Sequence, residues 1–255
     1  MTRRTTLLPT TATALALTLA LSGCAGLIEE ATSSPQPSAT ASPAASGAPG
    51  ADATAGAGGG AGAGEGLALA DAIGQLTIEP ETSGGYVRSS FKHWNSGQDA
   101  GDGCDTREEL LIAEAVTAPE TGTGCKLTGG SWFSYYDEVT VTNARGLDVD
   151  HIVPLEEAWS SGASQWDAAR REAYANDLDA ERSLVAVTAK TNRSKGAKDP
   201  AQWLPPADSA LCTYLEDWTA TKLRWNLTAD TAEQAALTEH ATQCPDSTIT
   251  YTPAT

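Results

Sequence analysis

Residues 150–155 read DHIVPL, and residues 192–196 read NRSKG. The first segment has the apolar and β-branched character of a strand that stops at Pro154. Asp150 places an oxygen ligand suited to a hard metal ion beside His151, whose imidazole accepts a proton near neutral pH. The chain has only three His residues, so few side chains compete with His151 for the role of general base.

The second segment supplies the partners that this chemistry needs. Asn192 offers a neutral oxygen ligand. Arg193, Lys195 and Lys198 offer cations for a substrate phosphate. They fall within residues 190–198, which contain no acid. Such a charge run more often marks a solvated face, but its place beside Asn192 favours a functional interpretation. The two segments together hold the parts needed to hydrolyse a phosphodiester with one bound metal ion.

A helical stretch and a second strand join these segments. Residues 147–155 alternate as a strand, residues 163–176 carry an apolar stripe at helical spacing, and residues 183–188 form a short strand. The expected order is strand, inserted helix, strand, helix. Strict alternation sends Asp150 and His151 to opposite faces, so a kink or the strand end must aim both at one site.

Further helices flank this unit, and the expected fold class is α+β. Asp105 or Thr106 can cap the first of them, and Asp230 with Glu233 makes a plausible capping box for the last. The expected flanking elements are a helix over residues 107–116, a strand over 132–141, and helices over 208–225 and 230–243.

The first 24 residues have the pattern of an export signal. Two arginines precede an apolar stretch, residues 7–21, that is short for a membrane span. Residues 21–24 (LSGC) resemble a bacterial lipobox, which implies cleavage before Cys24 and lipidation of its thiol. The alternative is an ordinary secretory signal that ends near a cysteine. We therefore expect an exported, extracytoplasmic lipoprotein whose only contact with the membrane is the lipid on Cys24.

The composition changes after the signal. Residues 25–66 are rich in Ala, Gly, Ser and Pro and predict a disordered tether. Residues 67–255 are long enough for one folded domain with a core of its own.

Four cysteines remain beyond Cys24, an even number that predicts two disulfides in an exported domain. No CxxC pair occurs, so no zinc site is expected. Three connectivities are possible. We favour Cys104–Cys125, across a Gly-rich loop, and Cys212–Cys244, because antiparallel helices place the start of one beside the end of the other.

The formal net charge of the chain is −17. Residues 1–66 contain two Arg and four acids and contribute −2, so the remaining residues carry −15. This balance argues against an indiscriminate nucleic-acid binder, because phosphate contacts supply most non-specific affinity. It does not exclude a nuclease whose basic residues are clustered at its active site.

The residue pattern resembles a known nuclease motif. DVDHIVP at residues 148–154, followed by N-R-x-K at 192–195, resembles the HNH, or ββα-metal, motif, including the HNH domains of CRISPR effector nucleases. The wider layout resembles bacterial secreted HNH endonuclease family proteins and covers most of residues 86–244. The segments that carry it are F-x-x-W at 91–94, CDTR at 104–107, and residues 148–163 and 192–206.

The resemblance implies a ββα-metal (HNH) core with an inserted helix and added helices, braced by two disulfides. It implies that His151 is the general base and that Asp150 and Asn192 bind a single Mg²⁺ (or Mn²⁺) ion. The implied substrate is nucleic acid, DNA with RNA as an open alternative, cleaved by a monomeric endonuclease. One departure concerns the middle motif position, usually Asn or His: here it is Ser183, or the pair Asn176-Asp177 displaced by an insertion.

Some residues have open interpretations. Arg107 and Arg145 are further candidates for the substrate phosphate, and the alternative for Arg107 is that it only braces the loop at Cys104. A second class of function is a non-enzymatic surface lipoprotein that binds a partner or a polysaccharide with a degenerate HNH fold. A third is an interbacterial toxin nuclease, which the lipobox disfavours.

Overall fold

The computed structural model describes residues 66–82 and 84–255. The expected signal segment with Cys24, and residues 25–65 of the expected tether, lie outside the described residues. The described part is a mixed α/β fold with four two-stranded antiparallel sheets. Within it, no helix combines the length and the apolar character needed to cross a membrane.

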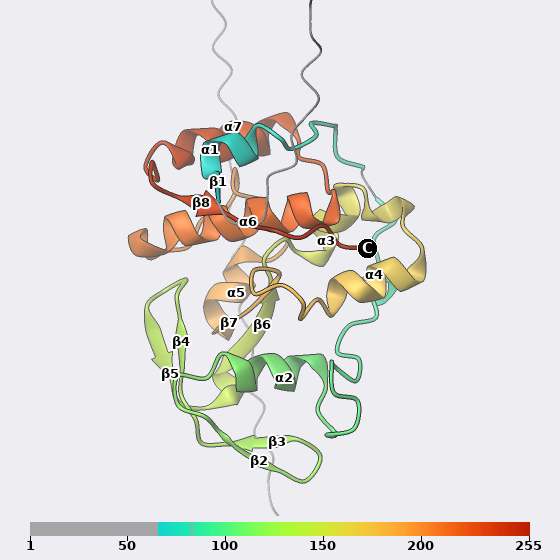
Figure 1. The fold of residues 1–255 in the computed structure, drawn as a ribbon, viewed down its shortest axis with the longest axis vertical. Coiled ribbons are helices and arrows are strands. Elements are labelled where there is room, and N and C mark those ends of the chain that lie inside the picture. The colour runs from blue at the N-terminus through green and yellow to red at the C-terminus, as the bar shows by residue number, and fades with distance from the viewer. Residues whose placement is uncertain (1–65, 83) are drawn as a thin grey trace, which may run out of the picture. The chain divides into compact units, whose positions relative to one another are not determined.

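The central unit is a hairpin followed by a helix (Figure 1). Strand β6 (Leu147–His151) pairs antiparallel with β7 (Leu184–Thr188), and Asp150 lies opposite Val185. Helix α5 (Ala189–Lys195) begins directly after β7 and contacts both strands. Because side chains alternate along a strand, one face of the hairpin packs on α5 and the other on α2 (Thr106–Ala113).

A helical insertion separates the two strands. It consists of α3 (Leu155–Ser160), the 3-10 turn η3 (Ala163–Gln165) and α4 (Ala168–Ala175). The expected strand over residues 147–155 is therefore too long: β6 ends at His151, and Pro154 stands at the N-cap of α3. The expected helix over 163–176 is also too long, because the side chain of Asp167 caps a new helix start by accepting from the backbone of Arg170.

The expected single strand over residues 132–141 is wrong. The chain forms a hairpin of β4 (Trp132–Ser134) and β5 (Val139–Val141). Its turn is fixed by a hydrogen bond from Ser134 Oγ to Asp137 and by Glu138, whose φ of 55° lies in the left-handed region.

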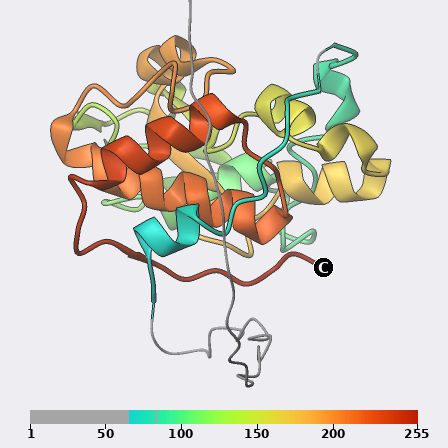
Figure 2. The same ribbon diagram turned by 90° about the horizontal axis from the view of Figure 1, so that it is seen from above.

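Helices α1 (Leu69–Ile73), α6 (Leu211–Trp225) and α7 (Thr231–Ala241) pack on one another (Figures 1 and 2). Their apolar faces contribute ten of the 25 buried residues of the larger core around Trp218. Asp105 caps α2 with a full capping box, and Asp230 caps α7. The remaining elements are β1 (Leu67–Ala68), η1 (Arg88–Ser90), β2 (Glu120–Gly122), β3 (Lys126–Thr128), η2 (Ala144–Gly146), η4 (Asp208–Ala210) and β8 (Thr248–Ile249).

Two disulfides brace the fold, with the favoured pairing. Cys104–Cys125 ties the segment before α2 to the turn between β2 and β3. Cys212–Cys244 joins the start of α6 to the residues after α7.

Candidate functional site

The end of β6 and the last turn of α5 border one surface cavity of about 400 Å³. Asp150, His151, Asn192 and Arg193 all line it. The remaining lining residues come from the start of η1 and the segment before it, from β6, from the start of α3 and from the residues after α5: Tyr86, Arg88, Val149, Pro154, Leu155, Glu156, Gly196 and Ala197. The two motif segments, some forty residues apart, thus meet at a single place.

Asp150 and His151 reach this cavity although the strand sends them to opposite faces. Asp150 lies on the α5 face, where Lys195 contacts it. His151 lies on the α2 face, beyond Leu147 and Val149 of the smaller core. Because His151 is the last residue of β6, both side chains border the same opening at the strand end.

The carboxylate of Asp150 is buried, and two side chains hold one of its oxygens. Tyr136 donates its hydroxyl to Oδ2 at 2.6 Å, and the ammonium of Lys195 also donates to Oδ2. Burial raises the pKa of Asp150, and the Lys195 charge and the two hydrogen bonds oppose that rise. Among the described residues, Oδ1 has no hydrogen-bond partner.

Lys195 lies in the interior, which corrects the expectation that it contacts substrate phosphate. Its side chain has no exposed surface. Besides Asp150, its ammonium donates to the backbone oxygens of His151 at 3.0 Å and Ile152 at 2.8 Å. Lys195 therefore fixes the end of β6 and the position of Asp150.

The imidazole of His151 has one ring nitrogen engaged. Nε2 lies 3.0 Å from the backbone oxygen of Ala175 at the end of α4. A carbonyl only accepts, so Nε2 carries the proton and Nδ1 is the basic nitrogen. Burial lowers the pKa of His151 to about 3, and the charge of Arg88 adds to that effect. The ring is thus neutral at pH 7.

Asn192 and Arg193 are tied to a second acid of β6. Asn192 donates through Nδ2 to Asp148 at 3.3 Å. The guanidinium of Arg193 forms an exposed ion pair with the same carboxylate at 3.3 Å. Because Nδ2 faces Asp148, the amide oxygen of Asn192 is the atom left for a metal or a ligand.

The other expected phosphate ligands lie apart from the cavity lining. Arg107 donates to the backbone oxygens of Ala144 and Leu147, at 3.2 and 3.1 Å, and so braces the start of β6. Arg145 is exposed in η2. Lys198 is exposed, and its ammonium donates to the Ser194 backbone oxygen at 2.8 Å. Of the expected cations, only Arg193 lines the cavity.

Ser183 and the pair Asn176-Asp177, the two expected occupants of the middle motif position, belong to one hydrogen-bond network. Ser183 donates to Asp177 at 2.6 Å, and Asp177 also accepts from Arg224 and Trp225. Asn176 accepts from the backbone of Asn95 at 2.9 Å. These contacts hold the chain beside Ala175, the acceptor for His151.

Sequence reasoning missed three contributors: Tyr136, Asp148 and Arg88. Tyr136 is fully buried and carries no motif signal. Asp148 lies inside the motif, and the strand face that it shares with Asp150 is the signal for its role. Arg88 lines the cavity from a segment far from either motif in sequence. A cation in so acidic a chain is the signal that the sequence offers for it.

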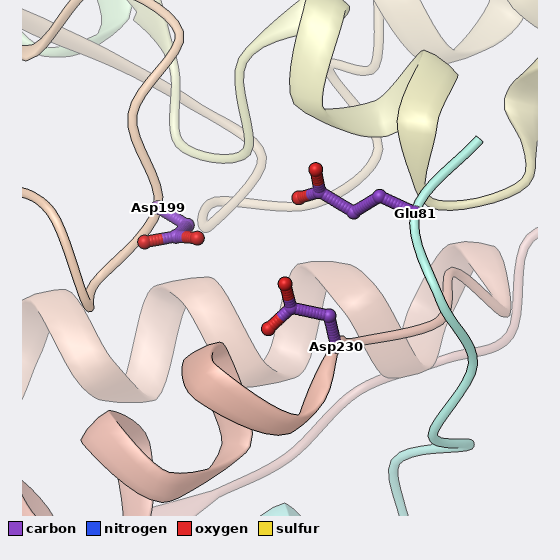
Figure 3. Close-up of side chains that lie close together, drawn as sticks. All are labelled: Glu81, Asp199 and Asp230. Atoms are coloured by element: carbon purple, nitrogen blue, oxygen red, sulfur yellow. The ribbon is translucent and has the colours of Figure 1, made fainter. Parts of the chain in front are cut away.

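A separate group of acids brings together the segment after α1, the loop after α5 and the N-cap of α7. The carboxylates of Glu81, Asp199 and Asp230 point toward one another (Figure 3), with oxygen atoms within 4.8 Å. Burial and the nearby charges of Glu157, Asp230 and Asp199 raise the pKa of Glu81 to about 7. None of these residues lines the cavity at His151.

Part of the chain is similar to a known family of domains. Residues 119–240 match the family model described as "GmrSD restriction endonucleases, C-terminal domain", a range that holds β6, β7 and α5. A relative from Arthroderma benhamiae, described as an "Uncharacterized secreted protein", is 40% identical over 170 residues, 66% of this chain and 81% of the relative. The chain therefore belongs to the same family as this protein. No solved structure matches the chain.

Proposed function

We propose that this protein is an exported, metal-dependent endonuclease of the HNH type. The observation that carries the proposal is the meeting of Asp150, His151 and Asn192 at one cavity. The hairpin β6–β7 followed directly by α5 supports a ββα core. The family model, described for restriction endonucleases, supports phosphodiester hydrolysis.

His151 is the proposed general base. Its Nε2 donates to Ala175, so Nδ1 is free to take a proton from the attacking water. Burial is the main cause of the low pKa of His151, and the charge of Arg88 adds to it; an anionic phosphate near Arg88 offsets the second cause and so strengthens the base in the complex. General-base assistance of this kind contributes ~10²–10⁴-fold in rate.

Asp150 and Asn192 are the proposed ligands of a single Mg²⁺ or Mn²⁺ ion. They fit a hard cation, because each brings an oxygen donor and because Oδ1 of Asp150 and the amide oxygen of Asn192 have no partner among the described residues. Such an ion, when bound, neutralises charge on the phosphate and on the leaving oxygen. Lys195 and Tyr136 hold Asp150 in place through its other oxygen.

Arg193 and Arg88 are the proposed contacts to the substrate phosphate. Both are exposed arginines that line the cavity, and a guanidinium matches two phosphate oxygens at once. The substrate class is nucleic acid, with DNA as the first choice and RNA as the second.

Export is part of the proposal. Two disulfides fit an oxidising compartment, and the related fungal protein is described as secreted. We propose that residues 67–255 form the catalytic domain of a monomer, and that residues 1–66 export and tether it through a lipid on Cys24. Metabolic labelling with a fatty acid, lost in Cys24→Ser, tests the anchor.

Plasmid nicking tests the enzymatic proposal. The wild-type chain is expected to nick DNA with Mg²⁺ or Mn²⁺, to stop on addition of a chelator, and to lose ~10²–10⁴-fold in rate in His151→Ala. His240→Ala is the matched control, because His240 lies on α7 and does not line the cavity. Equal rates for wild type and His151→Ala on both DNA and RNA refute the proposal.

A further inference from the structure

We propose that Trp94 is a positioning residue that sets the plane of the His151 imidazole. The inference rests on the proposed role of His151 as general base. The ring of Trp94 stacks on His151, with centroids 5.5 Å apart and planes 20° apart. Tyr174 is also nearly parallel to the imidazole, at 6.3 Å and 23°. These rings resist tilting of the imidazole, and the bond from Nε2 to Ala175 resists its rotation.

The backbone at Trp94 is held in an unusual conformation. Its φ is 59°, in the left-handed region that bulky side chains rarely adopt. Such a conformation persists only where the surroundings over-determine it. The next residue, Asn95, donates its N–H to Asn176 at 2.9 Å, and its backbone oxygen accepts from Thr106 at 3.0 Å. Two residues before Trp94, the backbone oxygen of Lys92 accepts from Asn176 at 2.8 Å.

The same end of α4 therefore anchors both stacked groups. Ala175 accepts from His151, and the adjoining Asn176 holds the chain on either side of Trp94. This shared anchor fixes the distance between the indole and the imidazole. The bonds at Lys92 and Asn95, on either side of Trp94, also hold its backbone in the left-handed conformation.

A role in positioning predicts a particular kinetic signature. Trp94 does not line the cavity, so its loss is expected to leave KM and metal affinity unchanged. Its loss frees the imidazole to tilt, and misplacement of a catalytic group by about 1 Å costs ~10²-fold in rate. We therefore expect kcat to fall by ~10–100-fold in variants that lack an aromatic ring at this position.

Three variants of the full-length chain separate positioning from folding. Trp94→Leu keeps apolar volume and removes the stack. Trp94→Gly removes the stack but suits the positive φ, so it relieves backbone strain. Trp94→Phe keeps a ring. Trp159→Leu is the control, because Trp159 is also partly buried and aromatic-packed and has no contact with His151.

The expected result is a lowered kcat in Trp94→Leu and Trp94→Gly, with most of kcat retained in Trp94→Phe and Trp159→Leu. Calorimetry with Mn²⁺ alone is expected to give equal affinity in all four. A loss in Trp94→Phe or Trp159→Leu as large as that in Trp94→Leu overturns the inference, as does full kcat in Trp94→Leu.

Nitrogen-15 NMR of the histidine rings gives a readout that needs no activity. Wild type is expected to show one tautomer for His151, protonated at Nε2, and Trp94→Leu a mixture. If the wild-type chain cleaves neither DNA nor RNA, the proposed function fails and this signal alone decides the inference: an unchanged tautomer in Trp94→Leu overturns it.

Discussion

Replacing Lys195 with methionine tests the most consequential correction to the motif. Methionine keeps the length of the side chain and removes its charge. The ammonium of Lys195 is fully buried on Asp150, whose side chain is only 7% exposed. If Lys195 instead met the substrate, its loss would weaken binding and leave stability unchanged.

The expected cost follows from the burial of the pair. Removing one partner of a buried ion pair costs about 3–5 kcal/mol, because it leaves the other charge unpaired. Two backbone oxygens, of His151 and Ile152, lose their donor as well. For a domain of this size, about 2–4 °C per kcal/mol gives a fall in Tm of roughly 6–20 °C.

The stability lost in Lys195→Met should depend on pH in a defined direction. Burial already raises the pKa of Asp150, and the Lys195 charge opposes that rise. Without Lys195 the pKa of Asp150 rises further, so the folded state takes up a proton that the unfolded state releases. The contribution of Asp150 to the stability of Lys195→Met is then largest below its unfolded pKa and is lost as pH rises through the folded pKa, so the deficit relative to wild type grows with pH.

Urea unfolding followed by tryptophan fluorescence measures this cost at pH 5 and pH 8. The double variant Asp150→Asn with Lys195→Met is the control, because removing both charges leaves neither unpaired. It should recover at least ~2 kcal/mol relative to Lys195→Met alone. A loss below ~1 kcal/mol in the single variant, equal at both pH values, would refute the assignment of Lys195 to the interior.

Three further outcomes follow from other contacts. Glu81→Gln should raise Tm at pH 8 and leave it unchanged at pH 5 (Figure 3). The pKa of the Glu81 carboxyl is raised to about 7 in the folded state, so its contribution to stability is present below its unfolded pKa and is lost as pH rises through the folded pKa. Equal effects at both pH values contradict this. Replacing Cys104 and Cys125 with alanine should lower the free energy of unfolding by about 2–4 kcal/mol, since the bridge spans 21 residues; urea titration measures the change. Asn176→Ala should lower kcat ~10–100-fold with KM unchanged, because it releases the segment at Trp94; a rise in KM alone would place Asn176 in substrate binding instead.

The strands and the helix that carry the site could be predicted because local sequence patterns determine them. The alternation in residues 147–151, the apolar run 184–188 and the glycine at 196 predict the strands and the end of the helix. The interior position of Lys195 was also accessible in principle. It follows Asn192 by three residues, and residues three apart share a helix face. A helix that turns Asn192 toward β6 must turn Lys195 toward it too.

The rest depends on contacts between segments distant in sequence. Arg88 and Trp94 reach His151 from about sixty residues away, and nothing in their local sequence marks them for it. The hairpin at 132–141 was missed because its turn residues, Tyr135 to Glu138, lack Gly, Asn and Pro. Aromatic residues favour a strand in local propensity, and the hydrogen bonds of Asp137 overrode that preference.

The helical insertion links the candidate base to the C-terminal helices. Residues 152–183 intervene between β6 and β7. Asp177 ties the end of this insertion to α6 through Arg224 and Trp225, and Asn176 ties it to the segment of Trp94. The acceptor of His151, Ala175, is the residue just before them. The orientation of the imidazole thus depends on the packing of α4 against α6, so stability of the C-terminal helices and geometry of the candidate base are physically coupled.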